Sequence, residues 1–206
     1  MPITLPLAVE VVCHRGASIV APENTLASAE AALEWGVAYL EIDLRTSRDG
    51  VLYVIHDPTV NRTTDGSGAV ADMDSGDIDA LDAGSWFGEE FRGQRVPRFD
   101  AYLDAVDGRA GIYVEIKEAD PERVVAMLRE RGILERCFFW SFDGDLVRHM
   151  GRRFPEVALM ARPQDFSTLE AAIENHRPRI LEVPPPLLTA ALGGEARSLG
   201  MKVMLG

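Results

Sequence analysis

The sequence has little cysteine, no long apolar run and no recognisable export signal. Its two cysteines, Cys13 and Cys137, both lie in apolar strand-like runs, which favours two buried thiols over a disulfide. No run reaches the roughly 20 apolar residues of a membrane span, so we expect no stable membrane insertion. Because the N-terminus lacks a basic region followed by a separate apolar region, no signal peptide is expected. These absences together predict a cytoplasmic protein.

Positive charge is also scarce. The chain has 21 Lys and Arg against 33 Asp and Glu, a net charge of −12. A protein that binds the phosphate backbone needs a basic face, so we expect no nucleic acid partner. An anionic membrane surface would repel the chain as well. A phosphate-containing substrate would have to be bound by a few placed cations and a metal ion.

Short apolar runs rich in β-branched residues alternate with helical patterns along most of the chain. The predicted strands cover 9–14, 38–45, 52–56, 112–117, 137–142, 157–161, 180–183 and 201–205. Several are almost continuously apolar, which is typical of parallel strands covered on both faces. This order predicts one α/β domain over 1–206, as either a doubly wound sheet or a closed (β/α)₈ barrel. The length is short for such a barrel, which usually needs about 250 residues.

Two segments depart from this alternation. Residues 57–99 are rich in Gly, Asp and Thr and carry clustered aromatic residues near their end, which predicts a small ordered insertion after the third strand. After the predicted strand 201–205 only Gly206 follows, so a final closing helix is absent from this sequence. The apolar flank of the last strand would be exposed unless the sequence is incomplete or a second chain covers it. A homo-oligomer is therefore one expectation.

Ionisable residues recur at or near the ends of four predicted strands. They are His14, Arg15, Glu41, Asp43, His56, Glu115 and Lys117. Residues two apart on a strand point to the same face, so Glu41 and Asp43 share a face, as do Glu115 and Lys117. In a parallel α/β barrel the carboxyl ends of the strands form one mouth, where these residues would meet.

Each of these features has a plainer explanation when taken alone. Two acidic residues on a strand can belong to a solvated edge, and an isolated Glu–Lys pair can be a surface ion pair worth less than about 1 kcal/mol. The same placement at four strands, in apolar surroundings, favours a common site. Burying so many charges would be very costly unless they neutralised one another or bound a metal ion. Three carboxylates without a cysteine favour one hard divalent cation, Mg²⁺ or Ca²⁺.

The motifs in their order resemble the glycerophosphodiester phosphodiesterase family. They are HRG at 14–16, PENT at 22–25, EIDLRTSRDG at 41–50, HD at 56–57, RTTDGSG at 62–68, VEIK at 114–117 and WSF at 140–142. The resemblance covers essentially the whole chain and implies a (β/α)₈ TIM barrel with one insertion after the third strand. It also implies hydrolysis of a small glycerophosphodiester to glycerol 3-phosphate and an alcohol.

The resemblance assigns roles to the same seven residues. Glu41, Asp43 and Glu115 would ligate the metal ion. His14 and His56 would form the acid–base pair, with His14 as the base and His56 as the acid, or the reverse. Arg15 and Lys117 would bind the phosphate. One departure is the last predicted strand, MKVMLG, where the family commonly carries an aromatic W-T-V-N segment.

Two other functions fit part of this pattern. A metal-dependent lyase or aldolase could use the carboxylates and Lys117 on a carbonyl substrate, although two histidines and Arg15 favour a phosphate. A non-catalytic barrel could keep the fold as a binding module, although His14 and His56 would then have no reason to be retained.

Overall fold

The computed structural model of the protein describes residues 9–206. Residues 1–8, on which the expectation of no signal peptide partly depends, lie outside the described residues. The described residues divide into two compact units, unit 1 with residues 9–113 and 117–119, and unit 2 with residues 114–116 and 120–206. Strand β4 (Gly111–Glu118) contributes residues to both. One domain over 1–206 stays a prediction.

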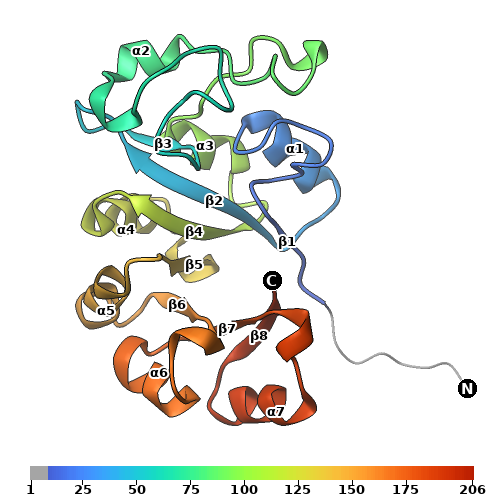
Figure 1. The fold of residues 1–206 in the computed structure, drawn as a ribbon, viewed down its shortest axis with the longest axis vertical. Coiled ribbons are helices and arrows are strands. Elements are labelled where there is room, and N and C mark those ends of the chain that lie inside the picture. Colours follow the sequence, from blue (N-terminus) through green and yellow to red (C-terminus); the bar gives the residue numbers. More distant parts are fainter. Residues whose placement is uncertain (1–8) are drawn as a thin grey trace, which may run out of the picture. The chain divides into compact units, whose positions relative to one another are not determined.

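Unit 1 is built on three neighbouring strands. β1 (Val12–Cys13) pairs in parallel with β2 (Tyr39–Thr46), and β2 is followed in the sheet by β4. Helix α1 (Leu26–Glu34) lies between β1 and β2 in the chain, and α3 (Phe99–Val106) precedes β4 (Figure 1). Because the side chains of Thr25 and Ser28 each accept a hydrogen bond from the other's backbone N–H, a capping box fixes the start of α1.

The third strand departs from the expected alternation of strand and helix. β3 (Leu52–Val54) pairs antiparallel with β2, with Leu44 opposite Val54 and Thr46 opposite Leu52. The connection at 47–51 is a tight turn with Gly50 at φ 88°. A parallel crossover needs about a dozen residues or more, so this turn can form only a hairpin. The predicted third strand is thus present, but it runs antiparallel to β2, unlike the third strand of a regular (β/α)₈ barrel.

Residues 57–99 contain short helical segments and share a hydrophobic core with the hairpin. The segments are η1 (Val70–Asp72), α2 (Ser75–Asp79) and η2 (Glu89–Phe91). The core joins this segment to the hairpin, because it consists of Tyr53, Ile55, Val60, Val70, Ile78, Ala83 and Val96. Trp86, Phe87 and Phe91 form two edge-to-face contacts with ring centroids 5.6 and 5.5 Å apart.

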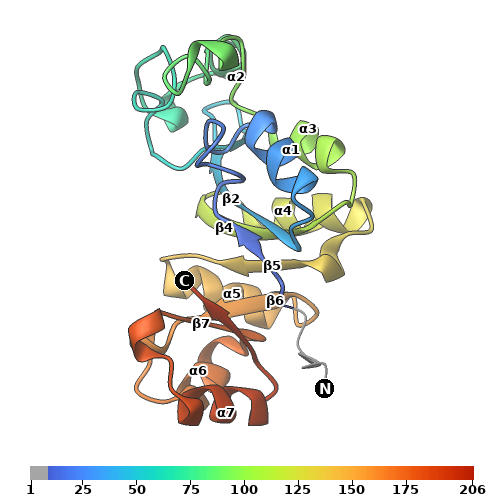
Figure 2. The same cartoon turned by 90° about the vertical axis from the view of Figure 1, so that its right-hand side faces the viewer.

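Unit 2 continues as parallel strands joined by helices. Its strands are β5 (Cys137–Trp140), β6 (Ala158–Ala161), β7 (Ile180–Val183) and β8 (Lys202–Leu205), each parallel to the next. Its helices are α4 (Pro121–Glu130), α5 (Gly144–Arg153), α6 (Leu169–His176) and α7 (Ala190–Ser198), with one-turn helices η3 (Leu134–Arg136), η4 (Pro163–Asp165) and η5 (Pro185–Leu187). Figure 2 shows β5, β6 and β7 beside α5, α6 and α7. No helix within residues 9–206 is long and apolar enough to cross a membrane.

The strand predictions outside β3 agree closely with the structure, except that only Val12–Cys13 of the predicted 9–14 run forms a strand. Cys13 and Cys137 form no disulfide, as expected; Cys137 is buried as predicted, whereas Cys13 is only partly buried.

Candidate metal and catalytic site

Strand β2 carries two carboxylates in fully buried surroundings. Glu41 is 2% exposed and Asp43 is 0% exposed, while Ile42 between them is buried on the opposite face. Asn24 Nδ2 donates a hydrogen bond of 2.8 Å to Asp43 Oδ2, and Lys117 Nζ lies 3.3 Å from Asp43 Oδ1. An amide N–H and an ammonium group thus both contact the buried carboxylate of Asp43.

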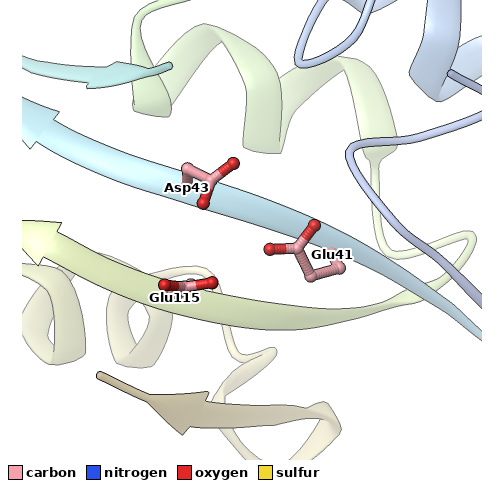
Figure 3. A group of neighbouring side chains, drawn as sticks. All are labelled: Glu41, Asp43 and Glu115. Atoms are coloured by element: carbon pink, nitrogen blue, oxygen red, sulfur yellow. The ribbon is translucent and has the colours of Figure 1, made fainter. Parts of the chain in front are cut away.

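Glu115, only 7% exposed on β4, completes a group of three buried acidic residues. One carboxylate oxygen from each of Glu41, Asp43 and Glu115 lies within 4.8 Å of the others (Figure 3). Asp43 Oδ1 accepts no hydrogen bond from any described residue. Three carboxylates so close repel one another unless they take up protons or a cation. Because all the donor atoms are carboxylate oxygens, the group fits a hard divalent cation.

The loop after β1 places Arg15 against these carboxylates. The backbone N–H of Arg15 donates to Glu41 Oε2 at 2.8 Å, and its Nε lies 3.3 Å from Asp43 Oδ2. Arg15 itself adopts a left-handed backbone conformation at φ 58°. Gly16 follows at φ 77°, and a Cβ there would lie 2.6 Å from Ser28 Oγ. A conformation that L-residues rarely adopt is thus kept where it aims a guanidinium at the acidic group.

His14 lies at the edge of the same group. Its side chain is 68% exposed, and its Nε2 is 3.9 Å from Glu41 Oε2. Desolvation, followed by the positive charge of Arg15, lowers the pKa of His14 below its usual value. The ring is therefore neutral near pH 7, and a neutral imidazole can accept a proton.

His56 is oriented by its neighbour in the chain. Its Nδ1 lies 2.6 Å from Asp57 Oδ1, and Arg62 Nε and Nη2 donate to Asp57 Oδ2 and Oδ1 at 2.8 and 3.0 Å. The hydrogen bonds from Arg62 hold the pKa of Asp57 far below its usual range. Because an ionised carboxylate can only accept, Nδ1 of His56 carries the hydrogen, and Nε2 is the nitrogen left to act.

A second forked contact of Arg62, to Glu23, links the His56–Asp57 pair to Arg15. Arg62 Nη1 and Nη2 donate to Glu23 Oε2 and Oε1 at 2.9 and 2.8 Å, and Arg15 Nη1 donates to Glu23 Oε1 at 2.9 Å. The contacts run in an unbroken series through Asp43, Arg15, Glu23, Arg62, Asp57 and His56. Charge alternates along it, so each member stabilises the next.

The structure thus places the predicted residues of β2, β4 and the loop after β1 around one acidic group. Sequence reasoning assigned no role to Glu23, Asn24, Asp57 or Arg62, although all four stand in motifs that carried the resemblance. The position of Asp57 directly after His56 was a usable signal, because a histidine with a neighbouring carboxylate is a common catalytic arrangement. Nothing in the sequence indicated that Arg62 would bridge two carboxylates.

A protein-family model described as the glycerophosphoryl diester phosphodiesterase family matches residues 14–160. The chain belongs to this family. Its relatives include a glycerophosphodiester phosphodiesterase of Bacillus subtilis, 34% identical over 185 residues, which cover 79% of this chain and 63% of the relative. Across three curated members, the chain spans 63% to 66% of the member's length.

Solved structures of the family support the fold. The glycerophosphodiester phosphodiesterase of Agrobacterium tumefaciens is 41% identical, with a TM-score of 0.92 over 96% of this chain and 86% of that one. An Oleispira antarctica phosphodiesterase, in complex with the product sn-glycerol-3-phosphate, is 26% identical, with a TM-score of 0.80 over 96% of this chain and 84% of that one. These likenesses confirm the predicted fold class, an α/β fold of the TIM-barrel type.

Proposed function

We propose that the chain is a metal-dependent glycerophosphodiester phosphodiesterase that releases glycerol 3-phosphate and an alcohol. The observation that carries the proposal is the group of three buried carboxylates whose oxygens lie within 4.8 Å of one another, with Arg15 and Lys117 bound to Asp43. Family membership supports the same reaction. A related enzyme holds sn-glycerol-3-phosphate as its product.

The cation would be Mg²⁺ or Ca²⁺, held by Glu41, Asp43 and Glu115. Both ions prefer oxygen ligands, and no cysteine belongs to the group. When bound, the cation would supply positive charge to the non-bridging oxygens of the phosphodiester, which otherwise repel a nucleophile.

Arg15 and Lys117 would bind the phosphate from the protein side. The guanidinium of Arg15 offers a planar fork that matches two phosphate oxygens. Its Nη1 is held by Glu23 and its Nε lies beside Asp43, so the side chain is positioned before the substrate arrives. Lys117 Nζ adds a second cation close to Asp43. The phosphate of a substrate with one negative charge would thus contact two cations, although the chain as a whole carries a net negative charge.

The two histidines would move the proton. His14, whose pKa is lowered, would accept it from the nucleophile, either water or the free hydroxyl of the glycerol. His56 would give a proton from Nε2 to the leaving alkoxide, while Asp57 stabilises the charged ring through Nδ1. With water as the nucleophile, one P–O bond is broken and one is formed, and the departing alcohol takes a proton. With the glycerol hydroxyl as the nucleophile, the same exchange gives a cyclic phosphate, which water must open in a second exchange to give glycerol 3-phosphate. Each histidine would contribute about 10²–10⁴-fold to the rate.

A coupled assay for released glycerol 3-phosphate tests the proposal. The full chain should act on glycerophosphodiesters with added Mg²⁺ or Ca²⁺, lose activity in a chelator, and lose at least about 10²-fold in kcat on His14→Ala. His149→Ala is the matched control, because His149 is a half-exposed histidine on α5 paired with Glu122. Activity that survives both the chelator and His14→Ala would refute the mechanism.

The contacts of Lys117 argue against the lyase or aldolase alternative. Its Nζ forms an ion pair of 3.3 Å with the buried carboxylate of Asp43, a contact that suits a phosphate-binding cation. A Schiff base requires a neutral amine. A homo-oligomer and a cytoplasmic location stay predictions.

A further inference from the structure

Unit 2 contains a pocket of about 430 Å³ at the carboxyl ends of β5 and β6. Its wall combines aromatic rings with polar side chains, and includes Trp140, Ser141, Phe142, Arg162, Asp165 and His176. None of these residues has a role in the reaction as described so far. The volume is enough for a small polar molecule of a few carbon atoms.

The pocket adjoins the strand that carries Glu115. Ser141 Oγ donates a hydrogen bond of 2.7 Å to the carbonyl of Ile116, the residue after Glu115. Glu182 on β7 is near enough to both Arg162 and Glu115 for their charges to act on its pKa in opposite directions, although burial is the larger cause of its raised value. The pocket wall thus contacts the strand that carries Glu115.

The aromatic part of the pocket already holds a cation. The guanidinium carbon of Arg162 lies 4.3 Å from the ring centre of Trp140 and 5.0 Å from that of Phe142. Asp165 fixes this position, because Arg162 Nε and Nη2 donate to its two oxygens at 2.9 and 3.0 Å. Phe142 is 71% exposed, as a ring that meets a ligand would be.

His176 adds no second positive charge to the pocket wall. His176 Nε2 lies 3.2 Å from the carbonyl oxygen of Gly144. A carbonyl only accepts, so this nitrogen carries the hydrogen and Nδ1 is an acceptor. Among the described residues Nδ1 has no hydrogen-bond partner, although the histidine is only 6% exposed. Desolvation lowers the pKa of His176, so the ring is neutral.

We propose that this pocket receives the alcohol moiety of the diester, and that Arg162 makes it select an uncharged polyol over a quaternary ammonium such as choline. The inference rests on the proposed phosphodiesterase function. Aromatic faces attract quaternary ammonium groups, but here the face of Trp140 is covered by the protein's own cation. A choline group would have to displace Arg162 from Asp165 or remain beside a like charge. An uncharged polyol would meet no such like charge.

The test compares glycerophosphoglycerol with glycerophosphocholine as substrates of the full chain, with metal present. We expect kcat/KM of the wild type to favour the glycerol diester by about 10-fold or more, because a displaced cation–π contact is worth about 1–2 kcal/mol. Arg162→Gln frees both rings and leaves Asp165 as a partner for an ammonium. The preference for the glycerol diester should therefore fall by about 10-fold in this variant.

Arg153→Gln is the matched control. Arg153 also stands over an aromatic ring, with its guanidinium carbon 5.0 Å from the ring centre of Phe154, and it also pairs with an acidic residue, Glu122, but it does not line the pocket. The ratio of kcat/KM for the two diesters in Arg153→Gln should equal the ratio in the wild type. An unchanged ratio in a folded Arg162→Gln would overturn the inference and leave the proposed function standing. A wild type that prefers the choline diester would overturn it without any variant, and a wild type inactive on both diesters would overturn both proposals.

Discussion

Replacing Arg62 tests whether the series of ion pairs positions His56. Arg62 touches two carboxylates, with two hydrogen bonds of 2.8 and 3.0 Å to Asp57 and two of 2.9 and 2.8 Å to Glu23. In Arg62→Ala, Asp57 loses the group that holds it, and the His56 ring loses its fixed orientation. We expect kcat to fall by about 10- to 100-fold, the usual effect of removing a residue that orients an active group. KM should change little, because Arg62 is not among the residues proposed to bind phosphate.

The effect on stability should be much smaller than the effect on rate. The Arg62 side chain is 43% exposed, and ion pairs in such positions contribute about 0.2–1 kcal/mol each. Urea unfolding of Arg62→Ala should therefore show a loss of about 1–2 kcal/mol at most. Arg48→Ala is the control, since Arg48 makes a similar forked pair with Asp74 and is also exposed. It should keep the wild-type kcat.

Two further variants test whether the loss in kcat comes from the orientation of the His56 ring or from a general loss of structure. Arg62→Lys keeps the charge but cannot bind both carboxylates with a planar fork, so it should restore only part of kcat. Asp57→Asn should cost about as much as Arg62→Ala, and the double variant should cost little more, because both changes release the same ring. Strictly additive losses in kcat, or an unchanged kcat in Arg62→Ala, would show that the series does not position His56.

Two more predictions concern the metal and acid stability. Asn24→Ala removes the 2.8 Å hydrogen bond to Asp43 Oδ2, so metal affinity measured by calorimetry should fall by about 10- to 100-fold, and an affinity equal to wild type would contradict this role. Hydrogen bonds from Ser47 and then Ser75 lower the pKa of Asp49 from 3.8 to about 2. A carboxylate whose pKa is lower in the folded protein stabilises the fold above its unfolded pKa, and this contribution disappears as pH falls through the folded value. The difference in the free energy of unfolding between wild type and Asp49→Ala, measured in urea, should thus be constant above pH 5 and should decrease between about pH 4 and pH 2. A difference that does not depend on pH would show that the charge of this carboxylate does not contribute to stability.

The sequence revealed the order of elements and the acidic residues because both follow local rules. Glu41 and Asp43 two positions apart in an apolar strand must share a face. The direction of β3 was also readable in principle, because the connection at 47–51 is too short for a crossover.

The contacts of long side chains were beyond sequence reasoning. Arg62 follows Glu23 by 39 positions, and nothing local indicates that one guanidinium will bind both Glu23 and Asp57. The position of Arg162 over Trp140 is of the same kind, because it depends on how the ends of β5 and β6 stand side by side. Parallel strands bring together residues that are far apart in the chain, and the pairing of individual side chains is decided by packing.

The shared core of the hairpin and residues 57–99 limits how this segment can vary. Tyr53 and Ile55, which lie three positions and one position before His56, are 0% and 3% exposed because they pack with Val60, Val70 and Ile78. Deleting these residues from the segment would remove the side chains that pack against the strand leading to His56. It would also expose apolar surface, which favours aggregation. Evolution can lengthen or trim it most freely at exposed turns such as the one at Gly93, where an added side chain would meet nothing within 4 Å, although its φ of 89° favours glycine.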